Sequence, residues 1–356
     1  MREPAGLHLD YVSPAEYQAA GWGDVLGVAS FNGSSASAAR GETPAAEIPA
    51  AEIPVAEVST PVLPAAARIC EVWRCAAPAE SGRRDGVRFR RTSDLLFGCI
   101  AVAESDVAPR RAGNGHSPLQ EATTQMYRQI CATVDAEGYP HLLRVWNYVP
   151  DINRDSHGTE RYRLFNSARQ QALESCGRPL TGRVPAASAL GAAGGSPLVA
   201  YFLAARTAPD FVENPRQVSA YHYPRRYGTH SPVFSRATLQ RQNGSLMLFV
   251  SGTASIVGHR SLHAGDTAAQ TRETLANIEA LLGEANRMAP GAHFALTDLA
   301  CKVYVRRPED LPLIQAELRR AVGASARAVY LRADICRQDL LVEIEAAGLY
   351  KVAAAA

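Results

Sequence analysis

Two glutamates, Glu343 and Glu345, stand two positions apart in the segment LLVEIEAAG near the end of the chain. Alternation along a strand places both of them, together with Leu341, on one face. A strand at the surface of the protein explains such glutamates simply, and burial statistics favour that interpretation. In a buried strand, desolvation would instead keep a carboxyl group protonated and able to donate a proton. The segment is therefore either a solvated edge or the site of a buried acid.

Two further segments contain residues that could contribute to a reaction. Cys336 precedes Glu343 by seven positions, across a predicted turn, and has no obvious histidine partner. A lone cysteine of this kind is more often a core residue than a nucleophile. The segment SGTASIVGH, Ser251–His259, ends a hydrophobic run, and small residues such as Gly252 let a ligand approach the backbone. A simple Gly/Ser turn explains this spacing equally well.

The segment YHYPRRYGTHSPVFSRA, Tyr221–Ala237, begins with three tyrosines and the adjacent Arg225 and Arg226 within seven positions. Adjacent arginines on a loop are usually just solvated. Tyrosines between them, however, supply flat walls and hydroxyl groups beside guanidinium groups, which bind carboxylates through two hydrogen bonds. The loop suits a small anionic substrate.

Composition excludes several classes of protein. The chain has 356 residues, a hydrophobic fraction of 47%, a charged fraction of 20% and a net charge of +2, which favours neither nucleic acid nor a membrane surface. No apolar run approaches the ~20 residues that span a bilayer, and the first residues lack the apolar core of a secretory signal, so we expect a cytoplasmic protein.

Metal and nucleotide sites are also not expected. The seven cysteines form no CxxC pair, and an odd number without a secretion signal indicates reduced thiols. His259 and His263 stand four apart, but no HExxH pattern surrounds them. GxGxxG and Walker-type loops are missing from the sequence. We expect no metal and no cofactor.

Hydrophobic periodicity predicts several helices separated by strands. Ser117–Val134 begins with a cap at Ser117, a proline at the first helical position and Gln120 in a capping-box pattern. Thr159–Leu173 is a second helix, with Thr159 as its cap. Two more helices are expected over Asp266–Ala285 and Asp310–Val322. Strand-like runs are DVLGVASF, ICEVWRC, GVRFRRTSDLLFGCIAVAE, YPHLLRVWNYVPDI, PLVAYFLAART, SLMLFVSGTASIVG, CKVYVRR, AVYLRADI and the closing LLVEIEA.

This order of elements predicts an α+β fold of two lobes, each a mixed β-sheet with helices on one face. We expect an N-terminal lobe over residues 1–175 and a C-terminal lobe over 176–356 that carries Glu343. The Gly/Pro/Ala-rich passage Gly177–Pro197 marks the boundary. Residues 44–58, PAAEIPAAEIPVAEV, form a five-residue repeat too short for a solenoid, which we interpret as a surface loop or hairpin.

The motifs together carry a family resemblance. LLVEIEAAG resembles the closing strand of the Rid/YjgF superfamily. In order, RVWNYVPDIN, GTERYRLFNSARQQAL, YPRRYGTHSPVFSRA, SGTASIVGH and ADICRQDLLVEIEA resemble the chorismatase family, over a match from about Val25 to the end of the chain. The resemblance implies two Rid/YjgF-like, or chorismate-mutase-like, lobes. It also implies chorismate as the substrate and pyruvate as one product, and two such lobes in one chain would suit a monomer.

The resemblance also implies roles for individual residues. Glu343 matches the acid that protonates the enolpyruvyl ether of chorismate. The residues expected to bind the two carboxylates of chorismate are Arg225 and Tyr221, with Arg226 as the alternative to Arg225, and Arg169 and Tyr162 from the second helix. The sequence leaves two interpretations of Glu345 open: its side chain pairs with an arginine, or it lies at the surface.

The implied product depends on Gly252 and Cys336. Within the family, an aromatising branch has glycine and cysteine at two pocket positions where a hydrolytic branch has other residues. Gly252 and Cys336 match the aromatising branch, which implies 3-hydroxybenzoate, with 4-hydroxybenzoate as a possible second product. Three alternatives stay open: a hydrolytic chorismatase that gives a dihydroxycyclohexadiene carboxylate, a Rid-like imine or enamine hydrolase, and a binding protein without activity. The chain length and the tyrosine-rich arginine loop argue against the Rid-like alternative.

Overall fold

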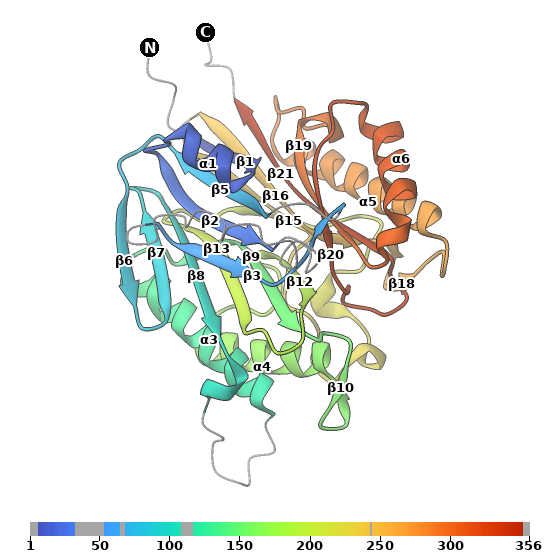
Figure 1. Cartoon of the computed structure of the whole chain (residues 1–356), viewed down its shortest axis with the longest axis horizontal. Coiled ribbons are helices and arrows are strands. Elements are labelled where there is room, and N and C mark those ends of the chain that lie inside the picture. Colours follow the sequence, from blue (N-terminus) through green and yellow to red (C-terminus); the bar gives the residue numbers. More distant parts are fainter. Residues whose placement is uncertain (1–5, 33–52, 65–67, 108–116, 243, 352–356) are drawn as a thin grey trace.

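The computed structural model describes residues 6–32, 53–64, 68–107, 117–242 and 244–351. Within these residues, three mixed or antiparallel sheets of four, six and seven strands are joined in one molecule (Figure 1). A hydrophobic core lies between them and takes side chains from all three, including Trp73, Trp146 and Tyr304. The fold is α+β, as expected from the sequence.

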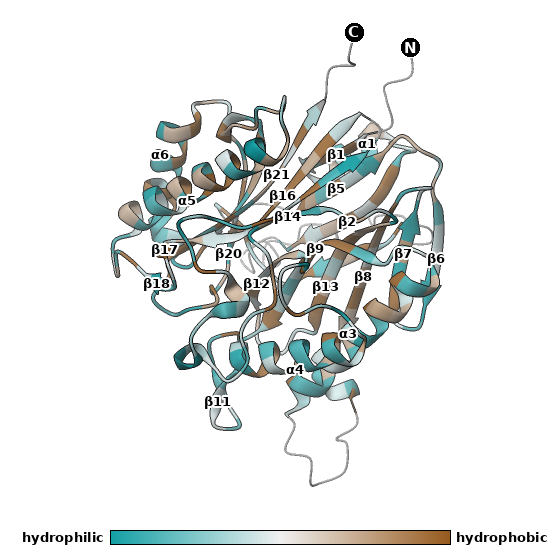
Figure 2. Cartoon of the chain, turned by 180° about the vertical axis from the view of Figure 1, so that it is seen from behind, coloured by the Kyte–Doolittle hydropathy of each residue, from teal (hydrophilic) through white to brown (hydrophobic). Residues whose placement is uncertain are grey.

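The six-stranded sheet is built from strands that lie between Glu80 and Ala205. Its strands, in spatial order, are β12 (Ala186–Ala192), β9 (His141–Pro150), β13 (Leu198–Ala205), β8 (Leu95–Val102), β7 (Val87–Arg91) and β6 (Glu80–Arg84). Helices α3 (Pro118–Ala136) and α4 (Arg161–Ser175) cover one face, where Met126, Ile130 and Phe165 join the strand side chains in a shared core. Figure 2 shows β8 and β13 as largely hydrophobic strands, consistent with their buried side chains.

The seven-stranded sheet is built from six strands that lie after Ala205 and from the short strand β4 (Val62–Leu63). Its strands, in spatial order, are β14 (Asp210–Val212), β15 (Ala237–Gln242), β16 (Ser245–Ala254), β21 (Val342–Lys351), β19 (Leu299–Val305), β20 (Arg327–Arg332) and β4. Helices α5 (Thr267–Met288) and α6 (Leu311–Val322) lie side by side on one face (Figure 1). Leu275, Ile278 and Leu282, which are spaced along one side of α5, are buried there.

Helix starts follow local chemistry, with one correction. Ser117 caps α3 in the predicted capping box with Gln120, and the side chain of Asp266 caps α5. Thr159, predicted as the cap of the second helix, instead pairs in a short hairpin between β10 (Asp155–Ser156) and β11 (Thr159–Glu160). Helix α4 therefore starts at Arg161, after Glu160, whose side chain makes no capping hydrogen bond.

A four-stranded N-terminal sheet was not expected. It consists of β1 (Leu7–Val12), β5 (Ile69–Cys75), β2 (Val25–Phe31) and β3 (Val55–Val58), with helix α1 (Pro14–Ala20) beside it. The strand β3 is the last unit of the five-residue repeat and pairs parallel to β2, so this unit is not a loop. Repeat residues 44–52 lie outside the described residues.

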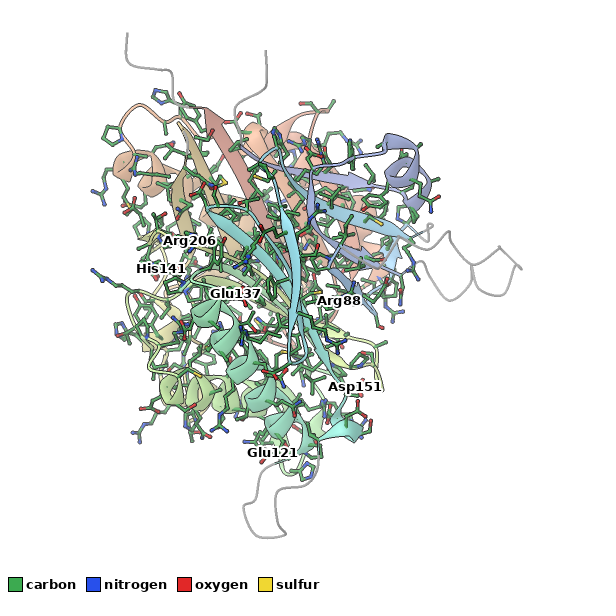
Figure 3. All side chains as sticks on the ribbon, turned by 90° about the vertical axis from the view of Figure 1, so that its left-hand side faces the viewer. Arg88, Glu121, Glu137, His141, Asp151 and Arg206 are labelled. Carbon is green, nitrogen blue, oxygen red and sulfur yellow. The ribbon has the colours of Figure 1, made fainter. Side chains whose placement is uncertain are left out.

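The sheets divide the chain differently from the expected boundary between residues 175 and 176. Strands β12 and β13 follow that boundary in sequence but belong to the six-stranded sheet, whereas β4, which precedes the boundary, belongs to the seven-stranded sheet. His141, the first residue of β9, and Asp151, which directly follows β9, are well separated in Figure 3. Among the described helices, none is long and apolar enough to cross a membrane.

Candidate active site

Strand β21 lies in the interior of its sheet and carries both glutamates of the closing segment. It is hydrogen-bonded to β16 on one side and to β19 on the other. Glu343 and Glu345 each retain only 3% of their solvent exposure. The surface-edge interpretation of these glutamates is therefore wrong, and each must be explained as a buried carboxyl group.

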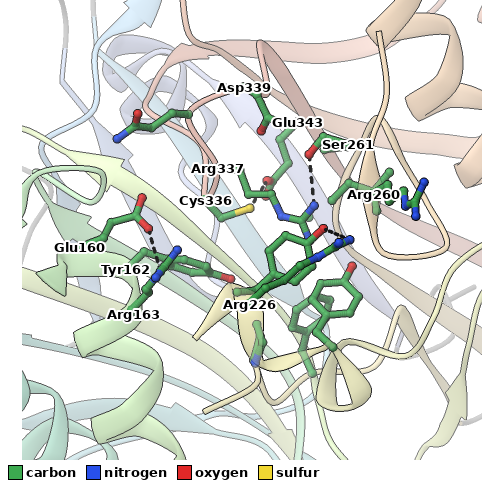
Figure 4. A pocket seen from close by; sticks show the side chains of 18 of the residues that line it. Glu160, Tyr162, Arg163, Arg226, Arg260, Ser261, Cys336, Arg337, Asp339 and Glu343 are labelled. Atoms are coloured by element: carbon green, nitrogen blue, oxygen red, sulfur yellow. Dashed lines mark hydrogen bonds and ion pairs between the residues drawn. The ribbon is translucent and has the colours of Figure 1, made fainter. Parts of the chain in front are cut away.

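A cavity of about 500 Å³ opens beside β21. Glu343, Cys336 and Gly252 line it, together with side chains from α4 and from the tyrosine-rich loop. A smaller space of about 40 Å³ shares these three residues and extends inward to Arg169 and Ser188. Figure 4 shows the Cys336 side chain pointing toward Glu343, with Tyr162 nearby. The acid is thus inside the molecule and still faces a space large enough for a small ligand.

Gly252 is the residue that this geometry requires at its position. The pairing of β16 with β21 is irregular between Val250 and Thr253, and Gly252 lies in this irregular stretch. A Cβ atom at Gly252 would lie 2.0 Å from Oε1 of Glu343, far inside contact distance. Any other residue here would therefore displace the carboxyl group.

Cys336 contacts the same carboxyl group from the other side. Its Sγ lies 3.9 Å from Oε2 of Glu343, within the range of a weak thiol hydrogen bond. Burial, and then the charge of Glu343, raise the pKa of Cys336 to about 12. The thiol is consequently neutral and can donate to Glu343, but it is not a thiolate nucleophile.

Glu345 is held by four donors. Arg144 Nη2 and Ser188 Oγ each donate to Oε2 at 2.7 Å, while Trp146 Nε1 and Lys302 Nζ reach Oε1 at 2.8 and 2.7 Å. Burial raises the pKa of Glu345, but Lys302 and Arg144 outweigh it, so the pKa lies below its usual value. Of the two possibilities that the sequence left open, Glu345 pairs with cations.

The same ion cluster joins the three sheets. Lys302 Nζ on β19 lies 2.5 Å from Oε2 of Glu71 on β5 and 2.7 Å from Glu345 on β21, and Arg144 comes from β9. These four side chains are each at most 3% exposed. Two cations thus balance two carboxylates without Glu343, which makes no ion pair with any described residue.

That balance leaves Glu343 without a compensating charge. Burial, and secondly the negative charge of Glu345, raise the pKa of Glu343 to about 8, against the weaker opposite influence of Arg144, the Cys336 thiol and Arg306. At neutral pH the group is therefore mostly a neutral carboxylic acid. A buried acid that remains protonated near pH 7 and faces a cavity is suited to general-acid chemistry.

Arginines and tyrosines form the wall opposite Glu343. The arginines that line the cavity are Arg163, Arg226, Arg236, Arg260 and Arg337. The Arg337 guanidinium stacks over Tyr227 at 4.1 Å and over Tyr223 at 5.2 Å. Several guanidinium groups on an aromatic wall favour an anionic, flat ligand.

Arg169 reaches the inner extension of the cavity from α4. It is 3% exposed, and its Nε and Nη2 atoms have no hydrogen-bond partner among the described residues. Its guanidinium lies over the ring of Tyr127 at 5.2 Å. A buried guanidinium with unpaired donors is costly unless a ligand completes it, so this group is suited to binding a carboxylate.

The structure brings together most of the residues singled out from the sequence. Those that line the cavity or its inner extension are Glu343, Cys336, Gly252, Arg226, Tyr162 and Arg169. Arg225 and Tyr221 are not among the lining residues: Arg225 is exposed, and the ring of Tyr221 packs edge-on against His222 at 4.7 Å. Of the two adjacent arginines, Arg226 faces the cavity and donates to His259 at 2.7 Å.

Comparison with known proteins shows the family of this chain. Residues 71–204 match the family model "Chorismatase FkbO/Hyg5-like, N-terminal". A 3-hydroxybenzoate synthase of Streptomyces hygroscopicus is 41% identical over 293 residues, which cover 80% of this chain and 82% of that protein. A chorismatase of Streptomyces rapamycinicus is 41% identical over 77% of this chain and 80% of its own length.

This chain belongs to the chorismatase family. A chorismatase crystal structure superposes on it with a TM-score of 0.83, at 32% identity, and covers 98% of this chain and 100% of that one. The match of folds extends over nearly the whole chain, so the N-terminal sheet that the sequence did not predict is part of the family fold and not an addition to it.

Proposed function

We propose that this protein converts chorismate into 3-hydroxybenzoate and pyruvate. The observation that carries the proposal is Glu343, a buried carboxyl group that faces the cavity and whose pKa is raised to about 8. Its relatives include proteins named 3-hydroxybenzoate synthase and chorismatase. The two products together contain all the atoms of chorismate, so the reaction consumes no water.

Glu343 supplies the proton in this proposal. The neutral carboxyl group protonates the methylene carbon of the enolpyruvyl ether, which makes the adjacent carbon oxocarbenium-like. The carboxylate that remains stabilises this positive charge. The bond between the ring carbon and the ether oxygen then breaks as the neighbouring ring hydroxyl attacks that carbon, and the side chain leaves as pyruvate. The attacking hydroxyl group gives its proton to the Glu343 carboxylate, which restores the acid and leaves an epoxide. The bond between the epoxide oxygen and its original ring carbon then breaks, the attacked carbon loses its proton and the oxygen takes one up, which gives 3-hydroxybenzoate.

The arginines hold the two carboxylates of the substrate. Arg169 binds one of them in the inner extension, where two of its donor atoms are unpaired. Arg226 and Arg337 bind the other nearer the opening. Tyr162 lies between these two ends and forms a wall beside the ring. Arg225 and Tyr221, which do not line the cavity, make outer contacts when the substrate enters.

The experiment that tests this proposal is direct product analysis. Purified protein is incubated with chorismate, and products are identified by chromatography and mass spectrometry against a sample without protein. We expect equal amounts of 3-hydroxybenzoate and pyruvate. Pyruvate with a dihydroxycyclohexadiene carboxylate would instead identify the hydrolytic alternative. If neither pyruvate nor a ring product is formed, chorismate cleavage is excluded. Turnover of an imine substrate would then favour the Rid-like alternative.

Cys336 is expected to steer the products. Its thiol fixes the orientation of the Glu343 carboxyl group and fills space beside the ring. A Cys336→Ser variant has nearly the same volume but presents a hydroxyl group that can hold water near the ring. We expect a severalfold larger share of hydrolytic product with less than a threefold change in total pyruvate. Cys176→Ser is the control, since Cys176 is also half-buried but does not line the cavity. Unchanged product ratios would refute the steering role.

Glu345 is expected to set the pH range of activity. Its charge is the second-largest cause that raises the pKa of Glu343. A Glu345→Gln variant removes that charge and leaves Lys302 and Arg144 with an excess of positive charge. The pKa of Glu343 should therefore fall, and the alkaline decline of kcat should begin at lower pH than in the unmodified protein. Glu160→Gln, at a cavity residue in β11 just before α4, is the control and should not move the decline. An unmoved decline in Glu345→Gln would contradict this role.

We further propose that the protein acts as a cytoplasmic monomer without a metal or cofactor. The hydrophobic core shared by the three sheets lets one chain enclose the whole cavity. Sedimentation at several concentrations tests the oligomeric state, and a mass of several subunits would contradict it. Activity that is lost on treatment with a chelator and restored by a metal would contradict the proposed chemistry.

A further inference from the structure

A second cavity, of about 610 Å³, lies at the other end of α4 and β9 from the candidate active site. It shares no lining residue with the first cavity. The active-site cavity takes Glu160 and Tyr162 from the start of α4, whereas the second takes Leu173 from its last turns. Helix α4 has 15 residues, so its two ends are roughly 20 Å apart. The second cavity is therefore a separate place for a ligand.

The walls of the second cavity are largely apolar. Leu142 and Leu173 are buried at its base, and Phe211 lies on β14 at its side. Four prolines complete the wall: Pro140, Pro179, Pro185 and Pro209. Proline rings and a phenylalanine give flat, stiff surfaces, and the volume is within the range of small-molecule sites. This lining favours a flat apolar body over a sugar or a polyol.

The charged groups around the second cavity are mainly cationic. Arg178, Arg183 and His141 line it, and Asp210 is the single acidic residue among the lining residues. Asp210 lies 3.4 Å from Arg241, which offsets its charge. Arg178 donates to the carbonyl oxygen of Pro140 at 2.8 Å and pairs with Asp135 at 2.5 Å, so it is fixed in place.

Arg183 differs from Arg178 because its guanidinium has no partner among the described residues. Its side chain is exposed and lines the cavity. His141 lies near both arginines, and its pKa is lowered, first by burial and then by the charges of Arg178 and Arg183. The histidine is therefore neutral at pH 7, although an anion in the cavity would favour its protonation.

We propose that this second cavity binds a small aromatic carboxylate, with Arg183 contacting the carboxylate and the proline and phenylalanine side chains covering the ring. Arg178 contributes its positive charge from a fixed position. One carboxylate suits Arg183, whose whole guanidinium group lacks a partner among the described residues, whereas Arg178 has only its buried Nε atom without one. The ligand is either the aromatic product of the proposed reaction or another aromatic acid, and the two sources share this chemistry.

The test is an NMR titration of His141 in the full-length protein with sodium benzoate. The histidine ring signals are followed from pH 5 to 9, with His141 assigned through a His141→Gln variant. We expect saturating benzoate to raise the pKa of His141, because the bound carboxylate offsets the charges of the arginines. A His141 titration that is the same with and without benzoate would overturn the proposal, whatever the protein does with chorismate.

Variants and competing anions make the test specific. Arg183→Gln should weaken benzoate binding at least about tenfold, the usual loss for a charge-assisted hydrogen bond. Arg163→Gln, at the other cavity, should leave it unchanged. Inorganic phosphate that shifts His141 as strongly as benzoate at equal concentration would overturn the aromatic part of the proposal. Tighter binding of 3-hydroxybenzoate than of benzoate would assign the site to the product of the proposed reaction. Equal affinity for the two ligands would assign the site to aromatic acids in general.

Discussion

Replacing Glu343 with glutamine should lower kcat for pyruvate release from chorismate by roughly 10²- to 10⁴-fold, the range that general-acid catalysis contributes. The amide has nearly the same shape as the neutral acid but cannot give up a proton to carbon. Binding should change little, because the arginines and tyrosines that would hold the substrate are untouched. The measurements are steady-state kinetics and the affinity for chorismate by calorimetry.

The Glu343→Gln variant should also remain folded. A raised pKa means that the folded protein favours the neutral form of Glu343, so its ionisation destabilises the fold as pH rises from about 4.5 through about 8. Glutamine removes that loss, and thermal stability at pH 9 should be at least that of the unmodified protein. A fully active Glu343→Gln variant would show that another group protonates the substrate. If the Glu343→Gln variant neither folds nor binds chorismate, the Glu343→Asp variant provides the kinetic test instead. Aspartate keeps the carboxyl group but holds it farther from the substrate, so kcat should fall less than is expected for Glu343→Gln.

Replacing Lys302 with methionine should destabilise the protein by about 3–5 kcal/mol, the usual cost of removing one partner from a buried ion pair. Lys302 is 1% exposed and lies between Glu71 and Glu345, which would be left with only Arg144 to balance them. One carboxylate would have to take up a proton on folding. The loss of stability should therefore be larger at pH 8 than at pH 5. Chemical denaturation at both pH values measures it.

A charge-balanced double variant separates charge from packing in this cluster. Lys302→Met with Glu71→Gln leaves one carboxylate, Glu345, with one cation, Arg144, which donates to it at 2.7 Å. Most of the lost stability should return, and the difference between pH 5 and pH 8 should disappear. A double variant as unstable as Lys302→Met alone, with no dependence on pH, would show that the lysine stabilises the protein through packing alone.

The sequence predicted the elements whose signals are local. Capping residues and apolar periodicity predicted helices α3, α5 and α6, because these signals come from residues within or directly beside each helix. Alternation placed Glu343 and Glu345 on one face of β21. It could not decide whether that face is buried, because β16 and β19 come from distant parts of the chain. The family resemblance, not periodicity, distinguished the two glutamates.

The ion cluster was missed although each member leaves a trace in the sequence. Glu71, Arg144 and Lys302 are single charges inside the apolar runs CEVW, LLRVW and CKVYV. Charged residues are almost never fully buried unless they are paired. Several isolated charges in strands expected to be buried therefore imply partners, but only the three-dimensional structure shows which ones. Their separation along the chain leaves no spacing rule that could connect them.

The sequence also could not show which arginine of the loop Tyr221–Ala237 faces the cavity. Arg225 and Arg226 are adjacent, and a short helical turn over Arg225–Tyr227 directs one of them toward the cavity. Sequence alone offers no basis for that choice. Arg337, which stacks on Tyr227, follows Cys336 directly and could have been considered because it is the only cation between Ala333 and Gly348.

The pH dependence of pyruvate release tests most directly whether Glu343 acts as a neutral buried acid. The central claim is that the cluster of Glu71, Arg144, Lys302 and Glu345 is balanced without Glu343 and so keeps it protonated. We predict that kcat for chorismate is constant between pH 6 and pH 7 and declines above pH about 8 toward a tenfold loss per pH unit. A kcat that instead rises through this range, or that already declines near pH 4.5, would contradict the account.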